Sequence, residues 1–466
     1  MSNFWDYKVW GGFNLVAVLL ISLILANGLK RVSKTLRRSL IPTSVLAGLF
    51  LLILSVVVRR VTGTGLFDLQ FFGDRGISAL EILTYHALAL GFIASTFRSK
   101  EAKFSKRRRL EIVQTGMTTV SSYLMQGIAG LLITLVASLI MRNFFPAAGI
   151  LLPFGYGQGT GQALNYGSIF ETDYGFTGGR SFGLTIAALG FLSASIGGVF
   201  FLNILKKKGL FAWKEETEEK FDASEVHPEG DIPMNGGIDK LTVEIGLVAA
   251  TYFLTYLFLY LIGSLLPGLR SVIYGFNFLF GVLMAILLRT ILDKLRKAGV
   301  IKREYRNSFM MHRLSNFFFD IMVVAGIAAI RLEAIKSYWG VIIVLAVAGL
   351  VLTWLYNRFI ANTLFPDYRA EQFLMMYGML TGTASTGIML LREADPEFKT
   401  PAADNLVYQN FPAMVLGFPM MLLATLAPKR PLITLLILIV FFLVLNAALL
   451  WNHLMPLLRK GKAKDA

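Results

Sequence analysis

Runs of apolar residues long enough to cross a membrane recur along almost the whole chain. They lie at about 11–29, 40–58, 77–97, 111–141, 181–202, 242–263, 270–291, 309–331, 337–359, 405–427 and 431–451. About 20 apolar residues in a helix span the hydrocarbon core, where no water can satisfy free backbone groups. The runs therefore predict an all-α polytopic membrane protein.

The composition agrees with this class and excludes two others. Hydrophobic residues make up 55% of the chain and charged residues 16%, which does not describe a soluble globule. The formal net charge is +16, but the basic residues lie in short loops between apolar runs, so we expect no nucleic-acid partner. The chain has no cysteine, and so it offers neither a disulfide nor a thiolate metal site.

Two glycine- and threonine-rich stretches interrupt the apolar sequence, one in each half. They are Gly155–Asn165 (GYGQGTGQALN) and Tyr377–Gly387 (YGMLTGTASTG). Each follows the fourth run of its half, precedes the fifth, and is followed by the pattern Glu-x-Asp-x-x-Phe, which begins at Glu171 and at Glu393. Backbone that leaves the helix at membrane depth must be buried in protein or line a wet cavity. We therefore predict an internal duplication, with re-entrant hairpins at about 149–171 and 370–392.

The distribution of Lys and Arg predicts the orientation. With the N-terminus outside, the inner loops carry roughly three times as many basic residues as the outer loops. The first half then starts outside and the second inside, so the two five-span repeats are inverted. The expected organisation is a first repeat (1–202), a cytoplasmic linker (203–240), a second repeat (241–428), and an extra span with a cytoplasmic basic tail (429–466).

The chemistry of the two stretches suits a small ion and a carboxylate. Unwound carbonyl groups and Thr or Ser hydroxyls supply the oxygen ligands of a dehydrated Na⁺, and helix N-termini that restart after the glycines attract a carboxylate. The alternative is that small residues merely allow close helix packing, but two matched stretches favour function. The predicted substrate-binding residues are Gln158, Gly159, Thr160, Gly161, Gln162, Asn165, Gly382, Thr383, Ser385 and Thr386.

Asp320 lies in the middle of the run 309–331. An acidic group at that depth costs about 2.5–3.5 kcal/mol on insertion scales, so we expect it to face a cavity and bind a cation or a proton. A structural pair with a basic group on a neighbouring span is the alternative. The predicted sodium ligands are Thr160, Thr381, Thr383, Asn316 and Asp320.

An enzymatic function is not expected. The chain has four histidines, and none pairs with a nucleophile at matching depth: His227 lies in the linker, and Ser385 has no evident base. No Gly-Lys-Ser/Thr follows the first glycine stretch, which excludes a phosphate loop. A lone His86 on an apolar run is more typical of a packing residue than of a functional one.

These motifs resemble the bacterial sodium/glutamate symporter family. The resemblance is carried by Gly157–Gly161 with Phe170–Phe176, by Ile41–Gly48, and by Gly378–Thr386 running on to Arg392–Phe398, and it extends over nearly the whole chain. It implies inverted five-span repeats with one re-entrant hairpin each. It also implies a homodimer in the bacterial inner membrane that carries substrate by an elevator motion of a transport domain against a scaffold.

Three features depart from the family pattern. Gln158 stands where the family usually has His, Thr383–Thr386 lacks the usual Pro, and the span at 431–451 is additional. These departures leave the substrate open. We expect Na⁺-coupled uptake of glutamate or a related amino acid or carboxylate, in contact with membrane lipids. A proton-coupled carboxylate or amino-acid transporter or exporter is the alternative, and a passive channel is a weaker one.

Overall fold

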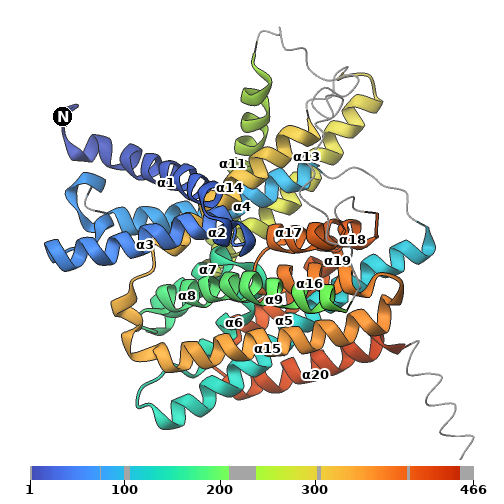
Figure 1. Cartoon of the computed structure of the whole chain (residues 1–466). Helices are drawn as coiled ribbons and strands as arrows, with labels where there is room; N and C mark the ends of the chain where they lie inside the picture. Colours follow the sequence, from blue (N-terminus) through green and yellow to red (C-terminus); the bar gives the residue numbers. More distant parts are fainter. Residues whose placement is uncertain are drawn as a thin grey trace, which may run out of the picture. The chain divides into compact units, whose positions relative to one another are not determined.

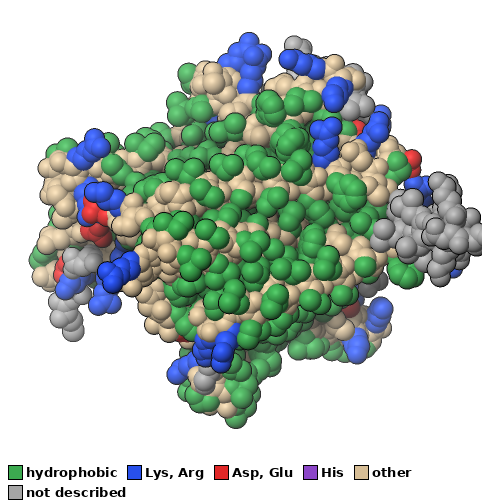
Figure 2. Space-filling view, turned by 90° about the horizontal axis from the view of Figure 1, so that it is seen from below, with side chains coloured by type: hydrophobic (Ala, Val, Ile, Leu, Met, Phe, Trp, Pro, Cys, Tyr) green, Lys and Arg blue, Asp and Glu red, His purple; other side chains and the backbone are tan. Residues whose placement is uncertain are grey.

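The computed structural model describes residues 3–73, 75–98, 105–208, 238–301, 306–395 and 399–451, and every regular element in these ranges is a helix. Eight of the described helices are long and apolar enough to cross a membrane, and a bent pair, Ala402–Tyr408 with Asn410–Leu426, makes a ninth. The face seen in Figure 2 is covered by hydrophobic side chains, with Lys and Arg at its margins. The prediction of an all-α, membrane-embedded, polytopic chain is confirmed. Most of the predicted linker, the basic tail and Phe398 lie outside the described residues.

The chain packs into two compact units, and each unit draws on both halves of the sequence. The first comprises Met1–Ala26, Leu46–Lys103 and Glu216–Ala329, and the second comprises Asn27–Val45, Phe104–Glu215 and Ile330–Ala466. The predicted repeats divide the sequence, whereas these units are defined by contacts within the structure. The repeat boundaries therefore stay a prediction.

The first unit contains most of the first three spans of each half. Its helices are α1 (Tyr7–Val32), α3 (Thr43–Thr62), α4 (Gly76–Arg98), α11 (Lys240–Leu265), α12 (Arg270–Gly275), α13 (Asn277–Lys297) and α14 (Ser308–Ala328). Helix α4 packs closely on α14, because Gly91 leaves room for the ring of Phe319 and its carbonyl accepts a 3.0 Å hydrogen bond from Ser315. The runs predicted at 270–291 and 309–331 are helical, but they are not among the eight strongly apolar helices.

The second unit is built around the 35-residue helix α5. Its helices are α2 (Lys34–Arg38), α5 (Lys106–Ile140), α6 (Leu151–Gln158), α7 (Thr160–Tyr174), α8 (Gly179–Leu192), α9 (Gly198–Lys207), α15 (Trp339–Leu364), α16 (Arg369–Thr381), α17 (Ala384–Ala394), α18 (Ala402–Tyr408), α19 (Asn410–Leu426) and α20 (Pro431–Leu449). Helices α15, α19 and α20 all pack along α5, and α15 and α20 run beside it in Figure 1. The predicted run 405–427 is bent by 49° at the junction of α18 and α19.

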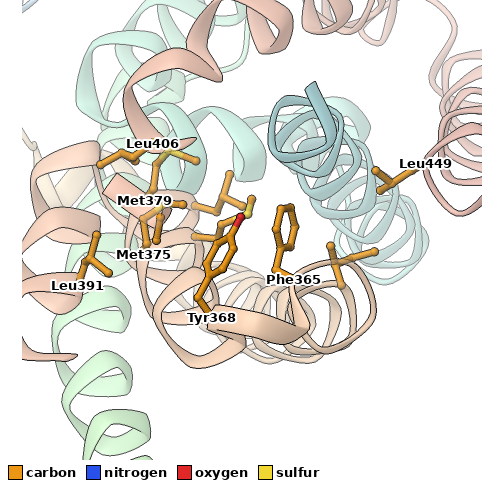
Figure 3. Packing of buried hydrophobic residues seen from close by; sticks show 11 residues of the cluster. Phe365, Tyr368, Met375, Met379, Leu391, Leu406 and Leu449 are labelled. Atoms are coloured by element: carbon orange, nitrogen blue, oxygen red, sulfur yellow. The ribbon is translucent and has the colours of Figure 1, made fainter. Parts of the chain in front are cut away.

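A buried apolar cluster fixes the start of α16. Phe365 and Tyr368 lie side by side, with ring centroids 5.8 Å apart, among Met375, Met379 and Leu406 (Figure 3). The cluster joins the end of α15 to α16, α17, α18 and α20. Close packing of these large side chains holds the start of α16 in place.

Candidate functional site

Both glycine- and threonine-rich stretches interrupt helices in the second unit. Helix α6 ends at Gln158 and α7 begins at Thr160, and Gly159 between them has φ +80° and ψ −170°. This backbone conformation is one that only glycine adopts readily. Helix α16 ends at Thr381 and α17 begins at Ala384. We call these two interruptions the first break and the second break.

Helix α5 donates a hydrogen bond to the last turn before each break. The hydroxyl of Tyr123 donates to the carbonyl of Gly157 at 3.0 Å, and Nε2 of Gln126 donates to the carbonyl of Leu380 at 3.0 Å. Gln126 also reaches Oγ1 of Thr353 on α15 at 2.7 Å. Tyr123 and Gln126 are three residues apart and so lie on one face of α5. One helix therefore satisfies carbonyl groups that each break would otherwise leave free.

Ser193 links the broken helices a second time. Its hydroxyl lies 2.9 Å from the hydroxyl of Tyr156 on α6, and its carbonyl accepts a 2.9 Å hydrogen bond from the hydroxyl of Tyr377 on α16. The Tyr156 hydroxyl also donates to the carbonyl of Ala346 at 2.7 Å. Ser193 begins a π-helical turn, Ser193–Gly197, between α8 and α9. Single π-turns inside helices are frequent at functional sites.

Gly190 on α8 allows α6 and α16 to approach each other. A Cβ atom at this position would lie 2.6 Å from the carbonyl oxygen of Thr381 and 3.3 Å from Cα of Tyr156. Any larger residue would push the two broken helices apart. Gly382 packs in the same way on the π-helical turn, where its Cβ would lie 3.0 Å from that of Ala194. The structure thus places the two breaks around one short stretch of α8 and the π-turn.

The residues predicted at the first break are mostly buried. Thr160, Gly161, Gln162 and Asn165 are buried, and Gln158 is half-buried. Nδ2 of Asn165 lies 3.5 Å from Oε1 of Gln162. Nε2 of Gln162 finds no hydrogen-bond partner among the described residues, although the side chain is only 1% exposed. A buried donor without a partner is costly, so this amide is suited to an acceptor supplied by a ligand.

The residues predicted at the second break are more open. Ser385 is exposed, Thr383 is half-buried, and Thr386 is buried with its hydroxyl 3.4 Å from that of Thr383. The Thr381 hydroxyl donates to the carbonyl of Tyr377 at 2.7 Å, which leaves its oxygen lone pairs for a cation. Neither α7 nor α17 has a side-chain cap at its N-terminus. Their first-turn N–H groups are therefore suited to a carboxylate.

A polar network anchors α16 to α5 beyond the apolar cluster. The Tyr368 hydroxyl donates to the carboxylate of Glu111 at 2.9 Å, and Arg108 pairs with the same carboxylate. Gln372 Nε2 donates to Thr115 Oγ1 at 3.1 Å. Burial raises the pKa of Tyr368, which keeps its hydroxyl protonated as a donor. The helix that leads to the second break is thus held at its start as well as at its end.

Asn316 and Asp320 belong to the first unit and not to the unit that contains the breaks. They lie one turn apart on α14, and both are exposed. Nδ2 of Asn316 lies 3.3 Å from Nε2 of His312. Of the five predicted sodium ligands, Thr160, Thr381 and Thr383 therefore belong to the second unit, and Asn316 and Asp320 belong to the first.

His86 is also in the first unit, where its Nδ1 lies 2.8 Å from the hydroxyl of Tyr252. Nδ2 of Asn277 lies 3.1 Å from the same hydroxyl. His86 itself is exposed, so the structure shows a hydrogen-bonded histidine, and its packing role stays a prediction.

Sequence reasoning missed Tyr123, Gln126, Tyr156, Ser193 and Tyr377. The Tyr-Gly pair that occurs in both stretches, Tyr156-Gly157 and Tyr377-Gly378, was an available signal. Gln126 was detectable as an amide within a long apolar run. Nothing in the sequence around Ser193 marks a π-turn.

Comparison with protein-family models and with curated proteins finds no significant match to this chain.

Proposed function

We propose that the protein is a secondary active transporter that couples the uptake of glutamate, or of a related amino acid or carboxylate, to Na⁺. The observation that carries the proposal is the way the spans of the two halves are divided between the two units. The first unit holds the first three spans of each half, and the second holds the fourth and fifth spans of each half together with both breaks. Such a division suits a scaffold and a transport domain built from inverted repeats.

In this proposal each break is the tip of a re-entrant hairpin, and the two tips serve one substrate. The N-terminal turns of α7 and α17 bind a carboxylate group, and the unpartnered amide of Gln162 supplies a further donor. The hydroxyl oxygens of Thr160, Thr381 and Thr383 provide neutral ligands for Na⁺. Tyr123 and Gln126 hold the preceding turns, so the free groups beyond the breaks keep their positions.

An elevator motion fits the way the second unit is held together. Hydrogen bonds link both broken helices to α5 and to the π-helical turn, which lets them move as one body. Inward movement of one net charge gains about 2.3 kcal/mol per 100 mV, enough to accumulate a substrate many-fold. A homodimer in the bacterial inner membrane, with the N-terminus outside and the C-terminus cytoplasmic, completes the proposal on the motif resemblance and the Lys/Arg bias.

The test is uptake by purified protein in proteoliposomes. A panel of labelled amino acids and dicarboxylates is offered with and without an inward Na⁺ gradient, and with a pH gradient in its place. We expect saturable uptake of one acidic substrate that requires Na⁺ and rises with an inside-negative potential. Uptake driven by the pH gradient alone indicates the proton-coupled alternative, and flux that neither saturates nor needs a gradient indicates a channel.

A further inference from the structure

A groove between α19 and α20 lies on the surface of the second unit. It has a volume of about 510 Å³ and is lined by Pro419, Leu422, Leu423, Leu426, Ile437 and Phe441. Every lining residue is apolar, and the volume is within the roughly 300–1,000 Å³ of ligand pockets. The two helices pack on α5 more than on each other, which leaves the space between them open. Pro419 lies inside α19, where it has no backbone N–H to donate and its ring crowds the preceding turn.

Two basic residues stand at one end of this groove. Lys429 and Arg430 both donate their backbone N–H to the carbonyl of Leu426, each at 3.0 Å, so the turn that carries them closes on a lining residue. Arg430 directly precedes α20, the helix that contributes Ile437 and Phe441 to the groove. Both side chains are exposed, and neither forms an ion pair within the described part of the chain.

We propose that this groove binds an anionic phospholipid, with an acyl chain along α19 and α20 and the phosphate on Lys429 and Arg430. An apolar channel that ends in two uncommitted cations matches the two parts of such a lipid. Basic pockets between membrane helices are suited to anionic head groups. A second copy of this chain is a poorer occupant, because its formal net charge of +16 does not complement a basic pair.

The experiment uses a single reporter in the groove and does not depend on transport. The chain has no cysteine, so Leu422→Cys introduces one thiol for an environment-sensitive fluorophore. The labelled protein is reconstituted in phosphatidylcholine with a small fraction of brominated lipid, either phosphatidylglycerol or phosphatidylcholine. Bromine quenches the fluorophore on contact, so the ratio of the two quenching curves measures the preference for the anionic head group.

The matched variants remove the same charge at two places. Lys429→Gln with Arg430→Gln changes the pair at the groove, and Arg59→Gln with Arg60→Gln changes another adjacent pair at the end of α3. We expect brominated phosphatidylglycerol to quench at a several-fold lower fraction than brominated phosphatidylcholine. Loss of the groove pair should remove most of this preference, so that the two brominated lipids quench at similar fractions. Loss of the control pair should leave it unchanged.

Two outcomes would overturn the inference. Equal quenching by the two lipids, or an equal effect of both double variants, means that the groove has no anionic site. Disulfide formation between unlabelled Leu422→Cys chains, together with quenching of the labelled protein that appears only on dilution into excess lipid, means that a second copy covers the groove. Because the readout is lipid contact, a negative result leaves the proposed transport function standing.

Discussion

Tyr377 donates its hydroxyl hydrogen to the carbonyl oxygen of Ser193, 2.9 Å away at the start of the π-helical turn. The Ser193 hydroxyl is in turn 2.9 Å from that of Tyr156 on the other broken helix. A single residue thus fixes the distance between α6 and α16, the helices that precede the two breaks. Buried hydrogen bonds of this kind stabilise a fold modestly when made and cost more when half-broken.

Removing the two tyrosine hydroxyls should uncouple the breaks. Tyr377→Phe should lower the free energy of unfolding by about 0.5–1.5 kcal/mol, since it deletes one hydrogen bond. Tyr156→Phe should lower it further, because its hydroxyl bonds both Ser193 and the carbonyl of Ala346. The double variant should deviate from the sum of the single variants, because both hydroxyls share Ser193. Thermal unfolding in detergent measures the stabilities. Tyr356→Phe is the control, because it removes a tyrosine hydroxyl that bonds Asn446 on α20 at 2.6 Å and not Ser193. Strict additivity would show that Ser193 does not couple the two helices.

Gln126→Leu should destabilise the second break more than the first. The substitution removes donors to Leu380 and Thr353 and leaves a buried carbonyl without a partner, which costs about 1–3 kcal/mol. Hydrogen exchange of α16 should rise while that of α6 stays close to the wild-type rate. Tyr123→Phe should give the reverse pattern, because its hydroxyl serves Gly157. The same increase in both helices for both variants would contradict separate support of the two breaks.

Much of this architecture could be read from the sequence because its causes are local. Apolar runs of membrane length must become helices, and the backbone at Gly159 needs a glycine. The hydrogen bond between Gln126 and Leu380 joins residues 254 positions apart, and no local pattern reveals such a pairing. The bend between α18 and α19 was missed for a related reason. The apolar pattern runs through it, and the two segments pack differently: α18 packs on both α5 and α16, whereas α19 packs on α5 and α20.

Gly159→Ala should impair uptake far more than Gly175→Ala. Both glycines have positive φ, +80° and +71°. Gly175 is in the left-handed region, where an alanine costs roughly 1–2 kcal/mol, whereas Gly159 with ψ −170° is in a region that only glycine adopts readily, at a cost of roughly 1–3 kcal/mol. Gly159 lies at the first break, whereas Gly175 ends α7 with nothing near its Cβ position. If the strain shifts the break, half-saturating substrate should rise about tenfold for Gly159→Ala and little for Gly175→Ala. Equal losses would mean that uptake follows stability alone.

Asp320→Asn tests whether an acidic residue of the first unit contributes to cation coupling. If Asp320 approaches the cation during the cycle, the Na⁺ concentration for half-maximal uptake should rise by about fivefold or more. Substrate selectivity should be unchanged, because a negative charge favours a cation over an anionic substrate. Na⁺ titration of uptake in proteoliposomes measures both. An unaltered Na⁺ curve in folded protein would make Asp320 a structural residue of α14.

The two breaks should open to each side of the membrane in turn. Single cysteines are placed at Gln162, which is buried, and at Ser385, which is exposed. In the conformation described here, a membrane-impermeant thiol reagent should modify Ser385→Cys much faster than Gln162→Cys. Substrate with Na⁺ should protect both positions, since the N-terminal turns of α7 and α17 are proposed to hold one carboxylate.

Reversing the Na⁺ gradient should move reactivity to the opposite face for both cysteines, as alternating access requires. A cysteine at Val300, which is 71% exposed beyond the C-terminal end of α13 and lies outside both breaks, should show no substrate protection. If substrate protects only one break position, the two breaks do not share a ligand. If labelling stays on one face under every gradient, a one-sided pocket or a pore explains the breaks better than a moving transport unit.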